Sequence, residues 1–280
     1  MFKDILIPYV NADSERAPMA AAMALAEAFD AHVAMLVTVD VPTPMPSDWG
    51  AMAYDLYARL HEEARKRAYD RVDMLRRNFA QSAVPVEFRT EEAVSLYPQN
   101  AASLQARYAD LTILPAMPRN GTEDMIVHDY FHDLLRHSGR PVLVVPEGHA
   151  ATLPPKRVVI AWKPTREASR AVADAMPLLH RAEAVDVLVI DPVVGESAHG
   201  SEPGADIAAH LARHGLKVEV STRPSMNFSV AYALLDHART VGADLVVAGG
   251  YGHSRLREAM LGGTTRELLQ TTHLPVLFSH

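Results

Sequence analysis

The chain has 280 residues, a formal net charge of −7 and no cysteine. This length favours two domains, each large enough to bury a core without cross-links. The negative charge argues against a nucleic-acid-binding surface, and the lack of cysteine excludes disulfides, thiol catalysis and cysteine-based metal sites. Because no apolar run approaches the roughly 18 residues of a membrane span, we expect a cytoplasmic protein with neither membrane nor nucleic-acid partners.

The first half alternates predicted strands and helices. Its short apolar run at residues 5–8 predicts a first strand and not a signal peptide. The pattern continues with a helix over 16–29, a strand over 33–40, a proline-rich loop over 41–49, a charged helix over 54–79 and a strand over 84–89. A further strand–helix–strand unit ends at 141–145.

The second half repeats this order after a linker over 146–155. Its predicted elements cover 158–161, 167–179, 185–191, 206–215, 217–222, 243–248 and 275–278, with a Gly-, Ser- and Pro-rich loop over 192–204. The Ala-Asp-Leu run at 109–111 recurs at 243–245, and the Pro-Val-Leu run at 141–143 recurs at 275–277, both at the same offset. Such internal similarity indicates a tandem repeat.

Strands that alternate with helices predict a parallel sheet covered on both faces, and right-handed crossovers make it doubly wound. We therefore predict an α/β protein of two tandem flavodoxin- or Rossmann-like domains, over residues 1–147 and 154–280. Each domain should hold a five-stranded parallel sheet with helices on both faces.

A glycine-rich segment follows the strand predicted at 243–248. It contains Gly249, Gly252, Gly262 and Gly263, and a predicted helix begins near Thr264. Glycine lets the backbone approach a ligand closely. The free N–H groups and the positive dipole end of a helix N-terminus attract phosphate. The segment therefore predicts a phosphate-binding loop in the second half.

The whole pattern resembles a tandem universal stress protein. ATP-binding members of that family carry a glycine, two residues, a glycine, nine residues, a glycine and then Ser or Thr. Gly249, Gly252 and Gly262 match this spacing, and the runs at 252–258 and 166–172 are also similar to the family. The resemblance implies that the halves pack as a pseudo-dimer, with the strands at 141–145 and 275–278 near its axis.

The resemblance also implies a function, that of a non-catalytic, cytoplasmic stress-response protein that senses or holds a ligand. The implied ligand is ATP or another adenine nucleotide. The residues that it would contact are Gly249, Gly252, Gly262, Gly263, Thr264 and Thr265 in the loop, and Ala161, Trp162, Lys163 and Asp191 near the adenine.

Two positions of the second half depart from the family pattern. Gly263 stands where the family has Ser or Thr, and the displaced hydroxyl of Thr264 lies about 100° further around the helix axis. Lys163 stands where the family has an Asp near the adenine and ribose, and lysine has no acceptor for an adenine amine.

The first half departs further from the pattern. Pro115, Pro118 and His128 occupy the positions of the three glycines, and Val10 occupies that of the Asp. Proline has no N–H to donate to a phosphate. We therefore predict that the first half lacks a phosphate loop and serves as a structural partner.

Two other functions remain as alternatives. One is a structural or protein-interaction module that has lost nucleotide binding, which Lys163 and Gly263 would explain. The other is a slow nucleotide hydrolase, although the sequence shows no evident base or magnesium-binding carboxylate beside the loop, so we expect no enzyme. The sequence is compatible with a single chain and with a homodimer.

Histidine pairs at helical spacing raise the question of a metal site. His128 and His132 lie four residues apart, as do His210 and His214, so each pair shares a helix face. With 14 histidines in the chain, such pairs arise by accident. We therefore predict no metal site from the sequence.

Overall fold

The structure, a computed structural model, describes residues 1–10, 15–40, 50–93, 97–117, 123–148, 152–192, 202–252 and 263–280. Its strands are β1 (Asp4–Pro8), β2 (His32–Asp40), β3 (Val86–Ala93), β4 (Leu111–Pro115), β5 (Val142–Val145), β6 (Arg157–Ala161), β7 (Ala184–Ile190), β8 (Val218–Arg223), β9 (Leu245–Gly249) and β10 (Val276–Ser279). Its helices are α1 (Arg16–Phe29), α2 (Gly50–Asn78), α3 (Pro98–Ala106), α4 (Glu123–His137), α5 (Arg166–Leu179), α6 (Ala205–Arg213), α7 (Val230–Thr240) and α8 (Gly263–Thr271).

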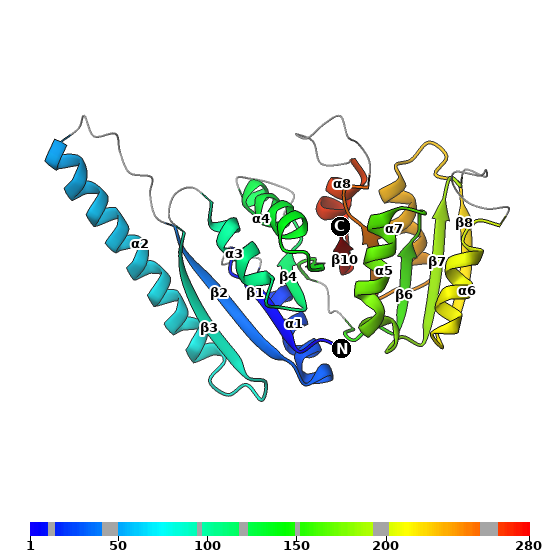
Figure 1. Ribbon diagram of the computed structural model, residues 1–280, viewed down its shortest axis with the longest axis horizontal. Helices are drawn as coiled ribbons and strands as arrows, with labels where there is room; N and C mark the ends of the chain where they lie inside the picture. Colours follow the sequence, from blue (N-terminus) through cyan, green and yellow to red (C-terminus); the bar gives the residue numbers. More distant parts are fainter. Residues whose placement is uncertain are drawn as a thin grey trace.

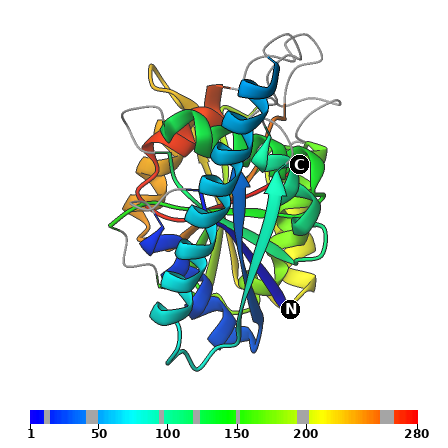
Figure 2. The same ribbon diagram turned by 90° about the vertical axis from the view of Figure 1, so that its left-hand side faces the viewer.

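The two halves share one ten-stranded sheet, in the order β3-β2-β1-β4-β5-β10-β9-β6-β7-β8 (Figure 1). Each half has the strand order of a Rossmann fold and not that of flavodoxin. The predicted α/β architecture of parallel strands with helices on both faces is confirmed, and Figure 2, viewed from the β3 end, shows helices on both sides of the strands. The two predicted five-stranded sheets, however, merge into one.

The third strand begins and ends later than the sequence predicted. We expected it over 84–89, whereas β3 runs parallel to β2 from Val86, opposite Val33, to Ala93, opposite Asp40. The long β2 supplies partners along this whole length, so pairing with the neighbouring strand sets the end of β3. The predicted loop at 41–49 lies outside the described residues.

Each face of the sheet carries one hydrophobic core that continues through both halves. On one face the core includes residues of α1, α2, α5 and α6, and on the other it includes residues of α3, α4, α7 and α8. Because each core crosses the midline, the halves bury apolar surface against each other. Among the described residues, no helix has both the length and the apolar character of a membrane span.

The midline of the sheet is the antiparallel pairing of β5 with β10. Val276 lies opposite Val144, and Phe278 lies opposite Val142. The predicted position of these two strands near the pseudo-twofold axis agrees with this register. Phe278 is fully buried and meets Phe131 of α4 edge-on, with 5.1 Å between ring centres. This contact joins the last strand of one half to the last helix of the other.

We predict that Phe278→Ala lowers the free energy of unfolding by about 3–5 kcal/mol, because it opens a cavity where both halves meet. Urea unfolding followed by circular dichroism should show a lower midpoint and still a single transition. Phe228→Ala is the control, since that ring is 59% exposed and its loss should change the midpoint little. Two separate transitions would contradict the shared core.

Candidate functional site

The site predicted from the sequence lies at the carboxyl ends of β6 and β9. These strands are parallel neighbours, with Ala161 opposite Ala248. The helices that follow them, α5 and α8, lie on opposite faces of the sheet, because α5 contributes to one core and α8 to the other. Such a topological switch point is where doubly wound sheets bind ligands.

Gly249 is required by packing. A Cβ atom at this position would lie 2.7 Å from the Ala168 nitrogen and 2.8 Å from the Glu167 carbonyl carbon. Both atoms belong to the backbone of the first turn of α5, which cannot move aside as a flexible side chain can. Gly249 therefore lets α5 begin directly against the end of β9.

Gly250 makes room for a side chain of the other half. A Cβ here would lie 2.5 Å from Cδ2 of Leu135, on α4 of the first half. The Gly250 N–H donates to the Ser279 carbonyl at 2.8 Å and so extends the pairing of β9 with β10. The Gly250 N–H therefore already donates a hydrogen bond within the sheet.

Tyr251 inserts its ring between the halves, with its backbone in the left-handed region at φ 59°. Ring centres of Phe131, His132 and His280 lie 6.2, 5.6 and 6.0 Å from that of Tyr251, and the guanidinium carbon of Arg136 lies 5.9 Å from it. The buried Tyr251 hydroxyl has no hydrogen-bond partner among the described residues. Burial accordingly raises the pKa of Tyr251.

A carboxylate borders the glycine loop. The Glu167 side chain, in the first turn of α5, is only 13% exposed, and its Oε2 lies 3.6 Å from where a Cβ on Gly252 would be. The Thr165 hydroxyl caps the same helix by accepting a hydrogen bond from the Ala168 N–H at 3.3 Å. The positive end of the α5 dipole therefore already faces an acid of the chain itself.

The predicted adenine contacts surround the end of β6. Ala161 and Trp162 are half-buried, and the Lys163 side chain is exposed. The Trp162 N–H donates to the Leu188 carbonyl at 2.9 Å. Asp191, beyond the end of β7, receives hydrogen bonds from the Ser225 N–H at 2.8 Å and from its hydroxyl at 2.5 Å. These bonds lower the pKa of Asp191 and fix its carboxylate on the loop before α7.

The start of α8 presents two of the predicted residues to solvent. A Cβ on Gly263 would have no atom of the described residues within 4 Å, and Thr264 is exposed. Thr265 is buried, and its hydroxyl accepts a weak hydrogen bond from the Tyr251 N–H at 3.4 Å. Gly262 lies outside the described residues.

In the first half, the ends of β1 and β4 correspond to the ends of β6 and β9, and other contacts of the chain lie there. After β4 and Pro115, the Met117 N–H donates to the Leu269 carbonyl of α8 at 3.0 Å. At the end of β1, the Val10 N–H donates to Oε1 of Glu15 at 2.6 Å, and Glu15 is 2% exposed. His128 lies inside α4 and not at its start, and Pro118 lies outside the described residues.

This geometry is that of a doubly wound α/β protein duplicated within one chain. The profile of the universal stress protein family matches residues 1–146 and again 155–280. The chain therefore belongs to this family, as the sequence resemblance indicated. No curated protein matches the sequence.

Solved structures of low identity share the fold over nearly the whole chain. One is a universal stress protein from Archaeoglobus fulgidus, with 14% identity and a TM-score of 0.69 over 99% of this chain and 97% of that one. Another is a protein of unknown function from Pseudomonas aeruginosa, with 17% identity and a TM-score of 0.59 over 99% and 92%. A third is the cytoplasmic domain of a prokaryotic cation chloride cotransporter, with 11% identity and a TM-score of 0.50 over 99% and 95%. At these identities the similarity shows the fold alone.

The two ends of the loop should respond oppositely to an added methyl group. We predict that Gly249→Ala destabilises the protein by about 1–3 kcal/mol, because its Cβ meets backbone atoms of α5. Gly263→Ala should be neutral or stabilising by up to about 1 kcal/mol, because its Cβ, at a helix start, would meet no atom of the described part of the chain. Chemical denaturation of both variants tests this, and a neutral Gly249→Ala would contradict the packing role.

His132 should make the protein less stable in acid. Burial lowers the pKa of His132, and the charges of Arg136 and His128 lower it further. The unfolded chain, in which the pKa of histidine is about 6.5, therefore binds this proton more readily than the folded chain. Its contribution to stability is complete above that pH and is lost as the pH falls below it. His132→Gln should show a smaller loss of unfolding midpoint between about pH 7.5 and pH 5 than wild type, and an equal loss would contradict this role.

Proposed function

We propose that this universal stress protein holds an adenine nucleotide in its second half, without catalysing a reaction on it, and that it acts in the cytoplasm. The observation that carries the proposal is the switch point between β6 and β9. There the exposed Lys163 lies on the segment between β6 and α5, and α8 begins with the open Gly263 and the exposed Thr264.

The chemistry of these groups suits a phosphate chain better than a neutral ligand. Helix N-termini offer free N–H groups to anions, and a lysine ammonium adds a compact positive charge. The half-buried Trp162 offers an apolar surface at the end of β6, on the side proposed for the adenine. Asp191 is the less suitable contact, because Ser225 already occupies both of its oxygens.

The Glu167 carboxylate makes the proposed binding depend on a divalent cation. Beside Gly252 it would repel a bare phosphate, whereas Mg²⁺ is commonly bound by one or two carboxylates together with phosphate oxygens. We therefore propose that the nucleotide binds as its magnesium complex, with Glu167 facing the metal. No magnesium-binding carboxylate is evident here from the sequence alone, because Glu167 lies far from the loop along the chain.

The first half, in this proposal, is a structural partner without a nucleotide. Two contacts support this role: the buried Glu15 accepts a hydrogen bond from the Val10 N–H at the end of β1, and the Met117 N–H donates to the Leu269 carbonyl of α8. The second candidate function is a protein-interaction module that has lost the ligand. The observation in its favour is that Gly250, Tyr251 and Thr265 are engaged in the contact between the halves or within the loop.

Calorimetric titration with ATP, AMP and cyclic AMP, each with and without Mg²⁺, tests the proposal. We predict that MgATP binds and that Lys163→Gln weakens it by about two- to fivefold, as expected for an exposed charge pair. Glu167→Gln should tighten ATP binding without magnesium and reduce its dependence on the metal. Lys156→Gln is the matched control, because Lys156 is exposed and directly precedes β6 at its opposite end.

Flat traces with every nucleotide at millimolar concentration would rule out nucleotide binding. The protein-interaction module would then be the remaining function. Phosphate release from ATP above background, abolished by Gly252→Pro, would reject the non-catalytic role.

A further inference from the structure

A second site lies away from the glycine loop, between α5 and α6. A pocket of about 470 Å³ opens there, lined by Ser169, Val172, Ala173 and Met176 of α5 and by Ile207, His210 and His214 of the α6 segment. Among the residues that the structure describes, the lining is mostly aliphatic and contains no Asp or Glu side chain. Its polar groups are the two imidazoles, one hydroxyl and the thioether of Met176.

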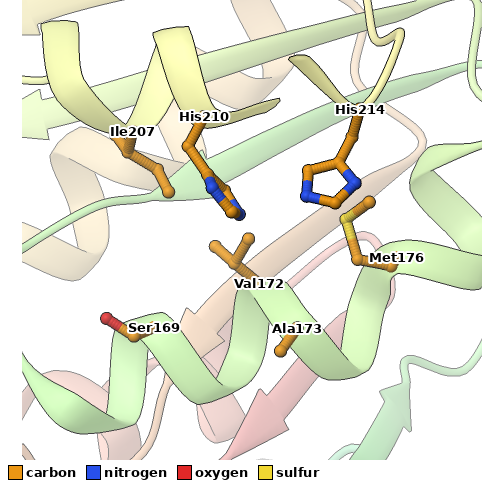
Figure 3. Close-up of a pocket in the computed structure, with 7 residues that line it drawn as sticks. All are labelled: Ser169, Val172, Ala173, Met176, Ile207, His210 and His214. Atoms are coloured by element: carbon orange, nitrogen blue, oxygen red, sulfur yellow. The ribbon is translucent and has the colours of Figure 1, made fainter. Parts of the chain in front are cut away.

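Three potential metal ligands converge in this pocket. Figure 3 shows both imidazoles pointing from α6 toward α5, and the side chain of Met176 rising from α5 toward His214. The two ring centres are 4.8 Å apart, with 65° between the ring planes. An ion bound at about 2.0 Å to one nitrogen of each ring would hold the ring centres about 4.5–6 Å apart. The observed separation falls in this range.

The donor set favours a soft, singly charged ion. A thioether selects Cu(I), and imidazole also suits copper. Hard divalent ions prefer carboxylate oxygens, which the described lining residues do not supply. Among the described residues, no group of three His, Asp or Glu side chains is placed to hold a metal, so a zinc site of the usual composition is absent there. His210 lies in the last turn of α6 and His214 follows it as the C-cap, where the helix dipole favours a cation.

We propose that His210, His214 and Met176 bind one Cu(I) ion in the pocket between α5 and α6. His210 and His214 anchor the ion from one helix, and Met176 completes a three-coordinate site from the other. This site shares no ligand with the nucleotide proposed above. The sequence pointed to no metal here because Met176 lies far from the histidine pair along the chain.

The other histidine pair provides an internal comparison. His128 and His132 have the same spacing on α4, but their rings lie 6.2 Å apart and nearly parallel, at 21°. Nδ1 of His128 lies 3.0 Å from Oδ1 of Asp129, and His132 packs against the Tyr251 ring. A spacing of four residues along a helix is therefore not enough to make a metal site. The arrangement of the two rings distinguishes His210 and His214 from His128 and His132.

Competition with the chromophoric chelator bicinchoninate, under anaerobic conditions with ascorbate, measures Cu(I) binding to the full chain. The absence of cysteine leaves no thiolate to compete. We expect one Cu(I) per chain, at least tenfold weaker binding in Met176→Leu, and loss of the bound ion in His210→Gln/His214→Gln. X-ray absorption should show a sulfur neighbour of the copper ion that Met176→Leu abolishes.

Two matched variants control for general effects. Met226→Leu changes a methionine that is 79% exposed, and His128→Gln/His132→Gln removes the other pair; both should bind Cu(I) as wild type does, with unchanged circular dichroism. Equal affinity in Met176→Leu and wild type would overturn the proposal. So would displacement of Cu(I) by an equimolar amount of Zn²⁺, because it would show that the thioether does not select the ion.

Discussion

The antiparallel pairing of β5 with β10 is the constraint on which the rest of the structure depends. Both strands have four residues, every one of them buried, and each would be an unpaired apolar edge if its half stood alone. By pairing with each other they remove both edges and continue both cores across the midline. Each half therefore covers the edge strand of the other, and the two repeats form one sheet with shared cores.

This arrangement determines what the loops after β4 and β9 can do. Both loops lie beside the midline, so each contacts the last helix of the opposite half, Met117 through its bond to α8 and Tyr251 through its ring against α4. The contact fixes the position of the Tyr251 ring at the start of the glycine loop. Lys163 and Thr264, at the start of α8, remain exposed, and Glu167 borders Gly252.

The two proposed sites use different parts of the same domain. The site at the carboxyl ends of β6 and β9 has charged groups of both signs, Lys163 and Glu167, which suit the proposed nucleotide accompanied by a metal ion. The pocket between α5 and α6 is aliphatic apart from its donors and suits a soft ion. Helix α5 contributes to both, with Glu167 in its first turn and Met176 in its last, so that the two sites lie about two to three helical turns apart.

The sequence by itself determined the tandem repeat, the alternation of strands and helices and the position of the glycine loop, because periodicity and repeated runs are local along the chain. Only the tertiary structure decided that Gly249 is needed for α5 and Gly250 for Leu135, that Glu167 borders the loop, and that Met176 lines the same pocket as His210 and His214. These contacts join residues distant along the chain, and which of them form depends on how strands pair and helices pack. Spacing within the glycine motif cannot reveal whether a glycine makes room for a ligand or for another part of the protein.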